Sequence, residues 1–288
     1  MSKLYVVGTP IGNLGDLSAR AVQTLETCDF IAAEDTRVTL KLLNHLGIKK
    51  PMVSYYEHNL RQRGQQIVDR ILAGERCAVV TDAGMPCISD PGEDLVRLCA
   101  EQGVPVEVVP GPSAVISALA VSGLSTSRFA FEGFLSVKKN SRFAHLEEIR
   151  EDTHTLVFYE APHKLRATLR DMLKVLGNRR IALARELTKV HEQVWRTTLE
   201  EAAEYYRENE PKGEFVLVLE GAPRKQPEQD APHIADAVEL VRQLADSGLS
   251  LAEAAKQAAK QTGYKKGELY RLAVEGCAGE AEQQLEEE

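Results

Sequence analysis

The chain has 288 residues, of which 43% are hydrophobic and 27% are charged, and its formal net charge is −8. This size leaves room for two globular domains and an appendage, and the acidic balance argues against a protein that coats nucleic acid non-specifically. The five cysteines contain no C-x-x-C pair, and no apolar run is long enough for a signal peptide or a membrane span. We therefore expect a soluble, cytoplasmic protein without a disulfide framework or a metal site.

The first 121 residues alternate short apolar runs with amphipathic stretches, which is the pattern of a parallel sheet covered by helices. The predicted strands span residues 4–8, 30–33, 52–56, 77–81 and 106–109. The predicted helices span residues 19–27, 39–46, 61–73 and 94–102. Gly47, Gly74 and Gly103 stand where the last three of these helices end. The pattern predicts a doubly wound α/β domain over residues 1–121.

Residues 122–221 are more aromatic and mix strands with helices in a different order, which predicts a second α/β domain. We expect its strands at 129–135, 155–160, 181–185, 193–197 and 215–220. Helices are expected near 142–150, 163–176 and 201–208. Thr198 and Glu201 fit a capping box that opens the last helix, because each side chain can bond a backbone N–H that the helix leaves unpaired.

The last part of the chain differs again in composition. Residues 222–233 carry three prolines among polar residues and predict a linker. Residues 234–288 predict a helical tail, in which the first helix ends at Ser247-Gly248, Ser250 caps the second, and a third follows Gly263.

Loops that follow the strands of the first domain are the expected place for a ligand, because open α/β sheets bind ligands outside the carboxyl ends of their strands. The loop at residues 8–16 spaces its glycines as G-x3-G-x2-G around Pro10, unlike the G-x-G-x-x-G of dinucleotide sites. Residues 110–114 read Pro-Gly-Pro-Ser-Ala, a rigid turn. Ser113 is expected to cap the next helix, and Ala114 leaves room for a flat ligand.

The loop at residues 81–93 joins a buried strand to a strongly specified helix start. Asp90, Pro91 and Glu93 fit the N-cap, N1 and N3 positions, so we expect the helix to begin there. Asp82 then lies in irregular backbone, either as a ligand-binding carboxylate or as a turn former. Each loop alone could be structural, but three such loops at corresponding strand ends indicate a binding site.

These loops, with residues 34–37 (EDTR) and 158–163 (FYEAPH), resemble the tetrapyrrole-methylase superfamily. The motifs at residues 9–14, 33–37, 89–92 and 109–112 resemble those of its ribosomal RNA cytidine methyltransferase branch rather than those of the precorrin and sirohaem methylases. The resemblance covers essentially the whole chain, including the tail. It departs at residues 85–87, where Met-Pro-Cys replaces the usual Thr-Pro-Leu, and this leaves the role of Met85 open.

The resemblance implies a two-domain class III methyltransferase fold with a helix-turn-helix-like tail, and a homodimer. It implies 2′-O-methylation of a cytidine ribose in the decoding region of 16S rRNA within the small ribosomal subunit. S-adenosylmethionine (AdoMet) is then the methyl donor, held between the domains without a metal. A carboxylate and small side chains suit such a ligand. The positions carried over as AdoMet contacts are Pro10, Asp82, Ala83, Gly84, Ser113 and Ala114.

The acceptor hydroxyl must lose its proton, either to a base or to solvent. Glu34, Asp35 and His58 are candidate bases, and Arg37 suits a phosphate. Glu34 and Asp35 could equally cap the helix that begins near Arg37, and His58 could be an ordinary surface histidine. Charges at residues 185–186 and 212–214 could face the cleft or simply end their strands. The sequence leaves these alternatives open.

Two other functions compete with rRNA methylation. A tetrapyrrole methyltransferase would share the fold and the donor, although the branch-specific loops and the tail argue against it. A DNA-binding regulator is suggested by the helix-turn-helix spacing of Ala259, Gly263 and Leu269. Residues 251–275 hold only five basic and three acidic residues, a weak electrostatic footprint. The tail could instead dock rRNA through those basic residues with Tyr264 and Tyr270, or simply pack on the body.

Overall fold

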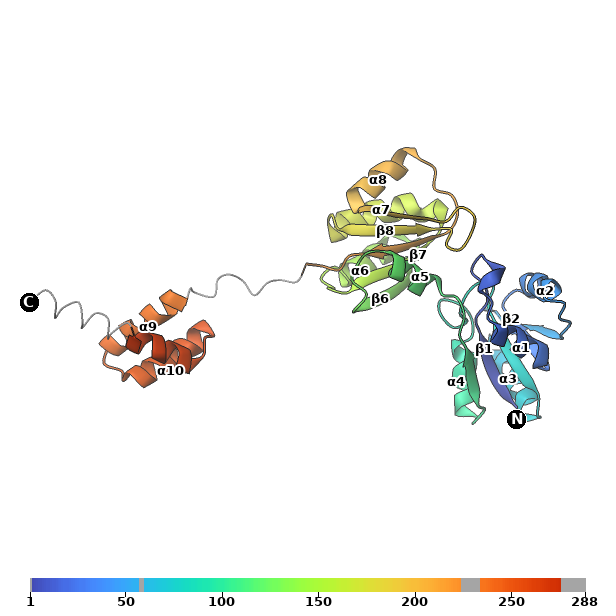
Figure 1. Cartoon of the computed structure of the whole chain (residues 1–288), viewed down its shortest axis with the longest axis horizontal. Helices are drawn as coiled ribbons and strands as arrows, with labels where there is room; N and C mark the ends of the chain where they lie inside the picture. The colour runs from blue at the N-terminus through green and yellow to red at the C-terminus, as the bar shows by residue number, and fades with distance from the viewer. Residues whose placement is uncertain (1, 57–59, 224–233, 276–288) are drawn as a thin grey trace, which may run out of the picture. The chain divides into compact units, whose positions relative to one another are not determined.

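The computed structural model of the protein describes residues 2–56, 60–223 and 234–275. The chain forms two compact units, Met1–Ala222 and Pro223–Glu288. The first unit contains two five-stranded sheets with their covering helices, and the second contains helices only in its described part (Figure 1).

The first sheet is entirely parallel, with strand order β3-β2-β4-β1-β5. Its strands are β1 (Lys3–Val7), β2 (Phe30–Ala33), β3 (Met52–Ser54), β4 (Arg76–Val80) and β5 (Val106–Val109). The connections contain η1 (Leu14–Asp16), α1 (Ala19–Thr27), α2 (Thr36–His45), α3 (Leu60–Leu72) and α4 (Glu93–Glu101). The predicted parallel sheet is confirmed, with each strand and helix within three residues of its predicted bounds.

Helices cover both faces of this sheet, as a doubly wound domain requires. On one face α1 and α2 pack through Ala21, Leu25 and Leu43. On the other face α3 and α4 pack through residues that include Ile67 and Leu95. The chain runs from β1 toward β2 and β3 at one edge, then returns to β4 and crosses to β5 at the other edge. The loops after β1 and β4 therefore flank the topological switch point, where such sheets bind ligands.

The second sheet is mixed, with strand order β6-β7-β10-β8-β9, and only β6 and β7 pair in parallel. Its strands are β6 (Phe129–Phe134), β7 (Thr155–Glu160), β8 (Arg180–Arg185), β9 (Gln193–Thr198) and β10 (Phe215–Leu219). One face is covered by α6 (Lys139–Glu148), α7 (Pro162–Leu176) and α8 (Leu199–Glu208).

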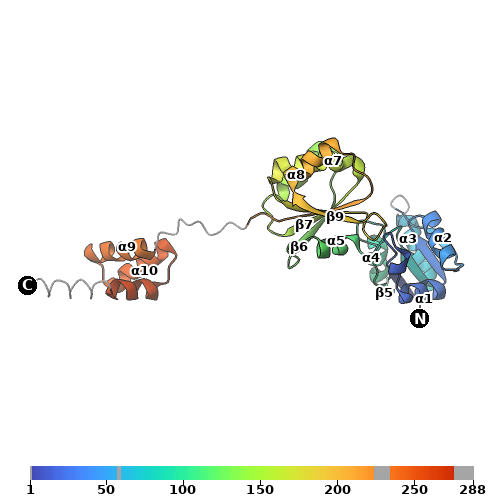
Figure 2. The same ribbon diagram turned by 45° about the horizontal axis from the view of Figure 1, so that its top comes forward.

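Helix α5 (Ala114–Val121) follows the last strand of the first sheet but packs on the second sheet. Its side chains Val115, Ala118 and Leu119 contact the face opposite to α7 and α8, and α5 runs beneath that sheet in Figure 2. The chain thus changes layers near the turn at residues 110–113. The domain boundary after Val121 stays a prediction.

Helix caps follow the expected chemistry in two places and depart from it in two others. Thr198 accepts a hydrogen bond from the Glu201 N–H at 3.2 Å, and Ser250 likewise caps α10 (Leu251–Thr262). The prediction for α4 is wrong, because its N-cap is Gly92 rather than Asp90. Ser113 occupies the N-cap position of α5, but its side chain makes no capping bond, so that prediction is also wrong.

The left-handed backbone of the loop before α4 explains the first of these errors. Cys87 (φ 72°), Ser89 (φ 64°) and Gly92 (φ 136°) all have positive φ, which tightens the loop into a curl. A Cβ at Gly92 would lie 2.7 Å from the Cys87 sulfur, so the curl needs glycine there. The helix starts only after the curl.

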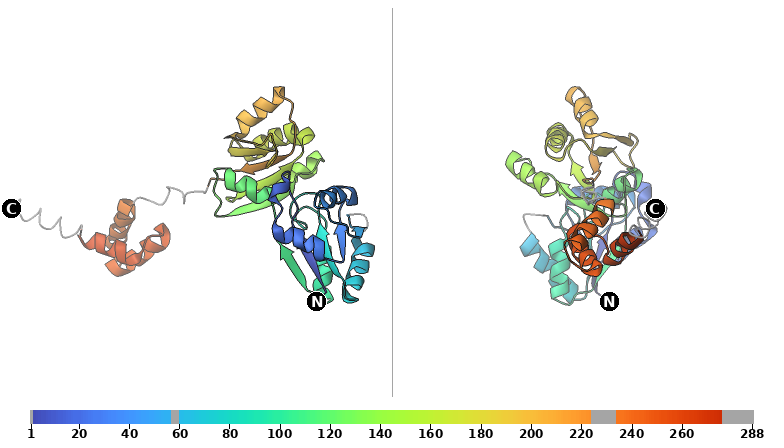
Figure 3. Two further views of the ribbon diagram at one scale, coloured as in Figure 1. Left: turned by 45° about the vertical axis from the view of Figure 1, so that its right-hand side comes forward. Right: turned by 90° about the vertical axis from the view of Figure 1, so that its left-hand side faces the viewer.

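In its described part, the second unit consists of helices joined by short turns. It contains α9 (Ile234–Asp246), α10 and a further helical stretch at residues 266–275, visible in Figure 3. Its core is formed by residues of the unit itself, among them Ala237, Val241, Ala258 and Leu269. The three predicted helices are confirmed, whereas residues 224–233 of the predicted linker lie outside the described residues. Within the described ranges, no helix is both long and apolar enough to cross a membrane.

Candidate active site

Backbone contacts draw together the loops after β1, β4 and β5. Thr9 and Gly84 exchange two backbone hydrogen bonds, of 2.9 and 3.2 Å. Gly8 lies so close to Gly111 that a Cβ at Gly8 would be 2.7 Å from the Gly111 Cα. The Met85 sulfur accepts a hydrogen bond from the Gly111 N–H at 3.3 Å. Met85 therefore links the loop after β4 to the loop after β5. The sequence left the role of Met85 open, and this contact gives it one.

A cavity of about 470 Å³ opens where these loops face the second sheet. That volume suits a small organic ligand. Its wall on the side of the first sheet includes Ile11, Glu34 and the loop from Thr81 to Asp90. Phe134, Tyr159, Ala184 and Glu214 are among the residues of the opposite wall.

Five of the six positions predicted to contact the cofactor line this cavity, namely Asp82, Ala83, Gly84, Ser113 and Ala114. Pro10 does not line it, although its neighbour Ile11 does. The role of these residues in binding AdoMet stays a prediction, but the fold brings residues from three separate loops to a single wall.

Glu34, Asp82 and Asp90 place three carboxyl groups on the first-sheet side of this cavity, which we call the carboxylate cavity, and Glu160 and Glu214 also line it. Glu34 accepts hydrogen bonds from the Thr81 hydroxyl at 2.5 Å and the Asp82 N–H at 3.3 Å. Burial, followed by the charge of Glu34, raises the pKa of Asp82. The same two causes raise the pKa of Asp90 to about 6. Asp90 can therefore exchange a proton close to neutral pH, a property common at functional sites.

Asp90 is the residue that the sequence interpretation missed, because Asp followed by Pro is a common helix start. A signal was nevertheless present two residues later. Gly92 is itself an acceptable N-cap, and a helix that starts at Gly92 leaves Asp90 in the loop.

The predicted acceptor-side residues do not all meet in the cavity. Glu34 lines it, whereas Asp35 and Arg37 do not, and His58 lies outside the described residues. Asp35 is the N-cap of α2 and pairs with the Arg37 guanidinium at 2.6 Å. Hydrogen bonds from Arg37 lower the pKa of Asp35 to about 2, which makes it a weak base. For Asp35 the capping interpretation is confirmed.

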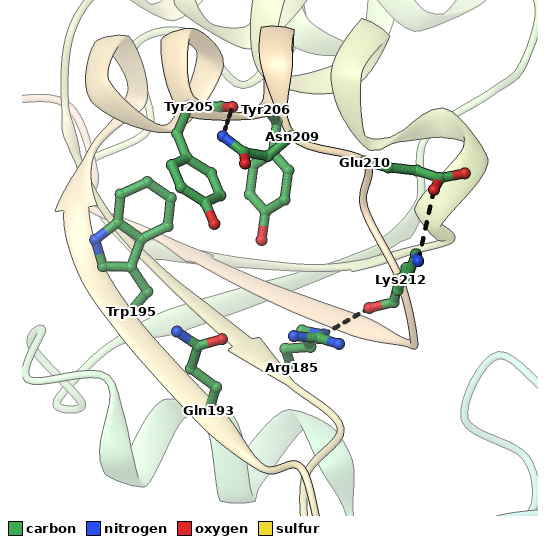
Figure 4. A pocket seen from close by; sticks show the side chains of 8 residues that line it. All are labelled: Arg185, Gln193, Trp195, Tyr205, Tyr206, Asn209, Glu210 and Lys212. Carbon is green, nitrogen blue, oxygen red and sulfur yellow. Dashed lines mark hydrogen bonds and ion pairs between the residues drawn. The ribbon is translucent and has the colours of Figure 1, made fainter.

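The charges at the ends of β8 and β10 separate into two groups. Glu214 lines the cavity and receives an ion pair from Lys189 at 2.7 Å, and Lys189 also contacts Glu186 at 2.9 Å. Arg185 and Lys212 line a different pocket, shown in Figure 4. Of the two charged segments left open by the sequence, only the Glu214 end therefore reaches the cavity that holds the carboxylates.

Comparison with known proteins identifies the family. The model of the Tetrapyrrole (Corrin/Porphyrin) Methylases matches residues 3–203, and that of the RsmI C-terminal HTH domain matches residues 231–276. Ribosomal RNA small subunit methyltransferase I of Synechocystis sp. is 48% identical, over 96% of this chain and 98% of its own length. The chain belongs to the ribosomal RNA small subunit methyltransferase I family. The protein is therefore a methyltransferase, and the resemblance found in its loops is confirmed.

Other members of the ribosomal RNA small subunit methyltransferase I family differ in length. The Bacillus subtilis protein is 41% identical over 94% of this chain and 93% of its own length. The Thermotoga maritima protein is 47% identical over 99% of its own length but only 77% of this chain. Its match spans 221 residues, close to the size of the unit Met1–Ala222.

Solved structures agree with the fold. Uroporphyrin-III C-methyltransferase of Thermus thermophilus has a TM-score of 0.55 at 19% identity, over 76% of this chain and 94% of that chain. The same enzyme complexed with S-adenosylhomocysteine has a TM-score of 0.53 at 20% identity, over 75% of this chain and 96% of that chain. At such identities the likeness concerns the fold alone, which is the predicted tetrapyrrole-methylase fold.

Proposed function

We propose that the protein transfers a methyl group from AdoMet to the 2′-hydroxyl of a cytidine ribose in the decoding region of 16S rRNA. The acceptor is then the small ribosomal subunit, and the reaction takes place in the cytoplasm. The names of relatives at 41–48% identity support rRNA as the acceptor. The observation that carries the proposal is the cavity at the switch point, where three loops place carboxylates beside small side chains.

The residues of the cavity fit AdoMet. Gly84 has a φ of +92°, and a Cβ there would lie 3.3 Å from Ile11, so the wall is shaped by glycine. The small side chains of Ala83 and Ala114 leave space for a flat adenine, and the Asp82 carboxylate can accept hydrogen bonds from amino or ribose groups. When bound, AdoMet supplies a methyl group already activated by its sulfonium. The neighbour complexed with S-adenosylhomocysteine supports this choice of donor.

The chain's own residues then have to align the acceptor and take its proton. We propose Asp90 as the base that takes the proton of the 2′-hydroxyl, because its carboxyl lines the cavity and has a pKa of about 6. Glu34 lies beside it and can orient the hydroxyl. Arg37, whose side chain is 87% exposed, remains our proposed phosphate contact outside the cavity. A homodimer, implied by the family resemblance, completes the proposal and is checked by analytical ultracentrifugation.

The test uses small ribosomal subunits that lack the modification, together with naked 16S rRNA and radiolabelled AdoMet. We expect label on the subunit at one cytidine, whose ribose methylation makes the adjacent linkage resistant to alkali. A labelled base instead of a labelled ribose would contradict the 2′-O assignment. Label on a tetrapyrrole such as uroporphyrinogen, with none on the subunit, would favour the alternative acceptor.

A further inference from the structure

A second cavity, of about 610 Å³, lies at the end of β8 on the face of the second sheet that α8 covers. Figure 4 shows its lining, which combines aromatic rings with charged and amide side chains. None of its residues lines the carboxylate cavity. The proposed methyl transfer leaves this second cavity without a role.

One wall of the second cavity is aromatic. The ring of Trp195 lies 4.9 Å from that of Tyr205, and the ring of Tyr205 lies 5.0 Å from that of Tyr206, measured between centroids. Tyr205 remains 48% exposed, and in Figure 4 both tyrosine hydroxyls point into the space above Gln193 and Arg185. Exposed aromatic walls of this kind stack unpaired nucleic-acid bases.

The opposite side supplies charge and hydrogen-bonding groups. Arg185 donates from Nε to the Lys212 carbonyl at 2.6 Å, which fixes the guanidinium at the rim. The Lys212 ammonium lies 3.7 Å from Glu210, and both side chains are more than 70% exposed, so this pair is weak. Within the described residues the Gln193 amide and the two tyrosine hydroxyls have no hydrogen-bond partner. Two cations, an amide and an aromatic wall together complement a phosphate, a sugar and a base.

The cavity is held in shape before any ligand arrives. Arg166 donates to the carbonyl of Tyr206 at 2.7 Å and to that of Asn209 at 3.2 Å. The Asn209 amide in turn donates to the Tyr205 carbonyl at 2.9 Å. These bonds anchor the end of α8, so binding needs little reordering of the wall.

The two cavities adjoin each other at the ends of the same strands. On β8, Ala184 lines the carboxylate cavity and its neighbour Arg185 lines the second. Before β10, Lys212 lines the second cavity, whereas Glu214 lines the first. Successive residues of a strand face opposite sides of its sheet, so a chain that bends around the strand ends can occupy both cavities.

We propose that the second cavity binds an unpaired nucleotide of the RNA that flanks the target ribose, with its base against Trp195 and its phosphate at Arg185 and Lys212. The inference rests on the proposed rRNA substrate. It adds a recognition element that paired RNA does not satisfy, because a base that remains in a helix cannot reach the aromatic wall.

Trp195 is the only tryptophan of the chain, so intrinsic tryptophan fluorescence observes this cavity directly. The intact protein, without AdoMet, is titrated with a single-stranded hexaribonucleotide. We expect saturable quenching that weakens as salt rises. A hexamer of the same ribose-phosphate backbone without bases, and a duplex RNA, should leave the fluorescence unchanged. Equal quenching by the hexamer without bases would overturn the proposal.

Variants separate the cavity from the catalytic chemistry. Arg185→Gln combined with Lys212→Gln should weaken the RNA affinity measured by quenching about tenfold, because charge-assisted hydrogen bonds to the phosphate are lost. Tyr205→Phe should retain binding better than Tyr205→Leu. Arg207→Gln, on α8 but outside the cavity, serves as the matched control because its partners, Glu204 and Glu208, lie on the same helix. Unchanged RNA affinity in the double variant would contradict the assignment.

Methyl transfer to the ribosomal subunit is measured on the same proteins. The double variant should raise the KM for the subunit and leave AdoMet affinity unchanged. If the wild type methylates the subunit but RNA does not quench Trp195, the proposed function stands and this inference fails. If RNA quenches Trp195 and the variants weaken it while the subunit is not methylated, the inference stands as an RNA site and the proposed acceptor fails. Fluorescence that instead follows protein concentration without RNA would identify a protein interface and overturn the proposal.

Discussion

Carboxyl groups crowd one end of the carboxylate cavity, and their surroundings give them different chemical roles. Asp82 accepts the backbone N–H of Asp35 at 3.2 Å and is exposed, which leaves its second oxygen available to a ligand. Asp90 is more enclosed and has the higher proton affinity, with a pKa of about 6. This difference suits one carboxylate for binding and the other for proton transfer.

Replacing Asp82 tests its assignment to the donor. Asp82→Ala should weaken AdoMet binding by about 1–3 kcal/mol, because a polar group of the ligand loses its partner. Isothermal titration calorimetry measures this change directly. Asp236→Ala, at an exposed position in α9, is the matched control and should bind as the wild type does. Wild-type affinity in a folded Asp82→Ala protein would remove Asp82 from the site.

Asp90 predicts a pH dependence of both activity and stability. As the proposed base it must be ionised, so activity should rise with pH through about 6 and be lost in Asp90→Asn. Its folded pKa exceeds the value of about 3.9 in an unfolded chain, so its contribution to stability is present at low pH and lost as pH rises through about 6. Asp90→Asn should therefore raise the Tm at pH 8 and have less effect at pH 5. A pH–rate profile that is unchanged in Asp90→Asn would exclude this carboxyl as the base.

The carboxylate cavity depends on the close contact between the loop after β1 and the loop after β5. Gly8→Ala would place a Cβ 2.7 Å from the backbone of Gly111 and from the Met85 sulfur, so the loops must separate. We expect a lower Tm, measured by differential scanning fluorimetry, and loss of most AdoMet affinity, measured by calorimetry. Gly267→Ala has open space at its Cβ and serves as the control. Wild-type AdoMet affinity in Gly8→Ala would show that the contact is dispensable.

Secondary structure could be predicted from the sequence wherever burial is periodic. The strands and helices of the first sheet were found because apolar positions repeat with the period of their element. The sheet on which α5 packs could not be predicted, because its sequence AVISALAV is apolar on all sides and shows no separate buried face. In the candidate site, the loops expected to bind the cofactor could be predicted from their place after the strands and from their resemblance to the family. Asp90 and the second cavity did not, because they depend on left-handed loop backbone and on rings ten residues apart in the chain, Trp195 and Tyr205.

At the scale of the whole molecule, the helical unit is the part whose role a deletion can test. Backbone packing places the cut, since the Ala222 N–H donates to the Asp152 carbonyl at 2.6 Å and Gly221 packs against Thr153. A protein that ends at Pro223 keeps these contacts. Met1–Ala222 is a compact unit, which supports the expectation that the remaining chain folds.

The truncated protein should bind AdoMet as the full chain does but methylate the ribosomal subunit less efficiently. The proposed reason is the loss of exposed Lys256, Lys260, Lys265, Lys266 and Arg271, which can contact phosphates. The deficit should shrink at high salt, where these contacts are already weakened. Lys265→Gln with Lys266→Gln in the full chain should reproduce part of the deficit. Wild-type efficiency of the truncated enzyme across a salt series would exclude a role for the tail in recognition.

The core of the helical unit also determines how the molecule responds to heat. That core consists mainly of alanines, with Val241 and Leu269 as its larger members, whereas the second sheet alone buries many leucines and aromatic rings. Small side chains remove little apolar surface from water, so the helical unit should melt with a small enthalpy and at a lower temperature. A calorimetric scan of the intact protein should show a minor early endotherm that AdoMet does not shift, followed by a major one that it does. Two-state thermodynamics then describes each unit separately, and the Tm changes expected for the variants of the carboxylate cavity belong to the major endotherm.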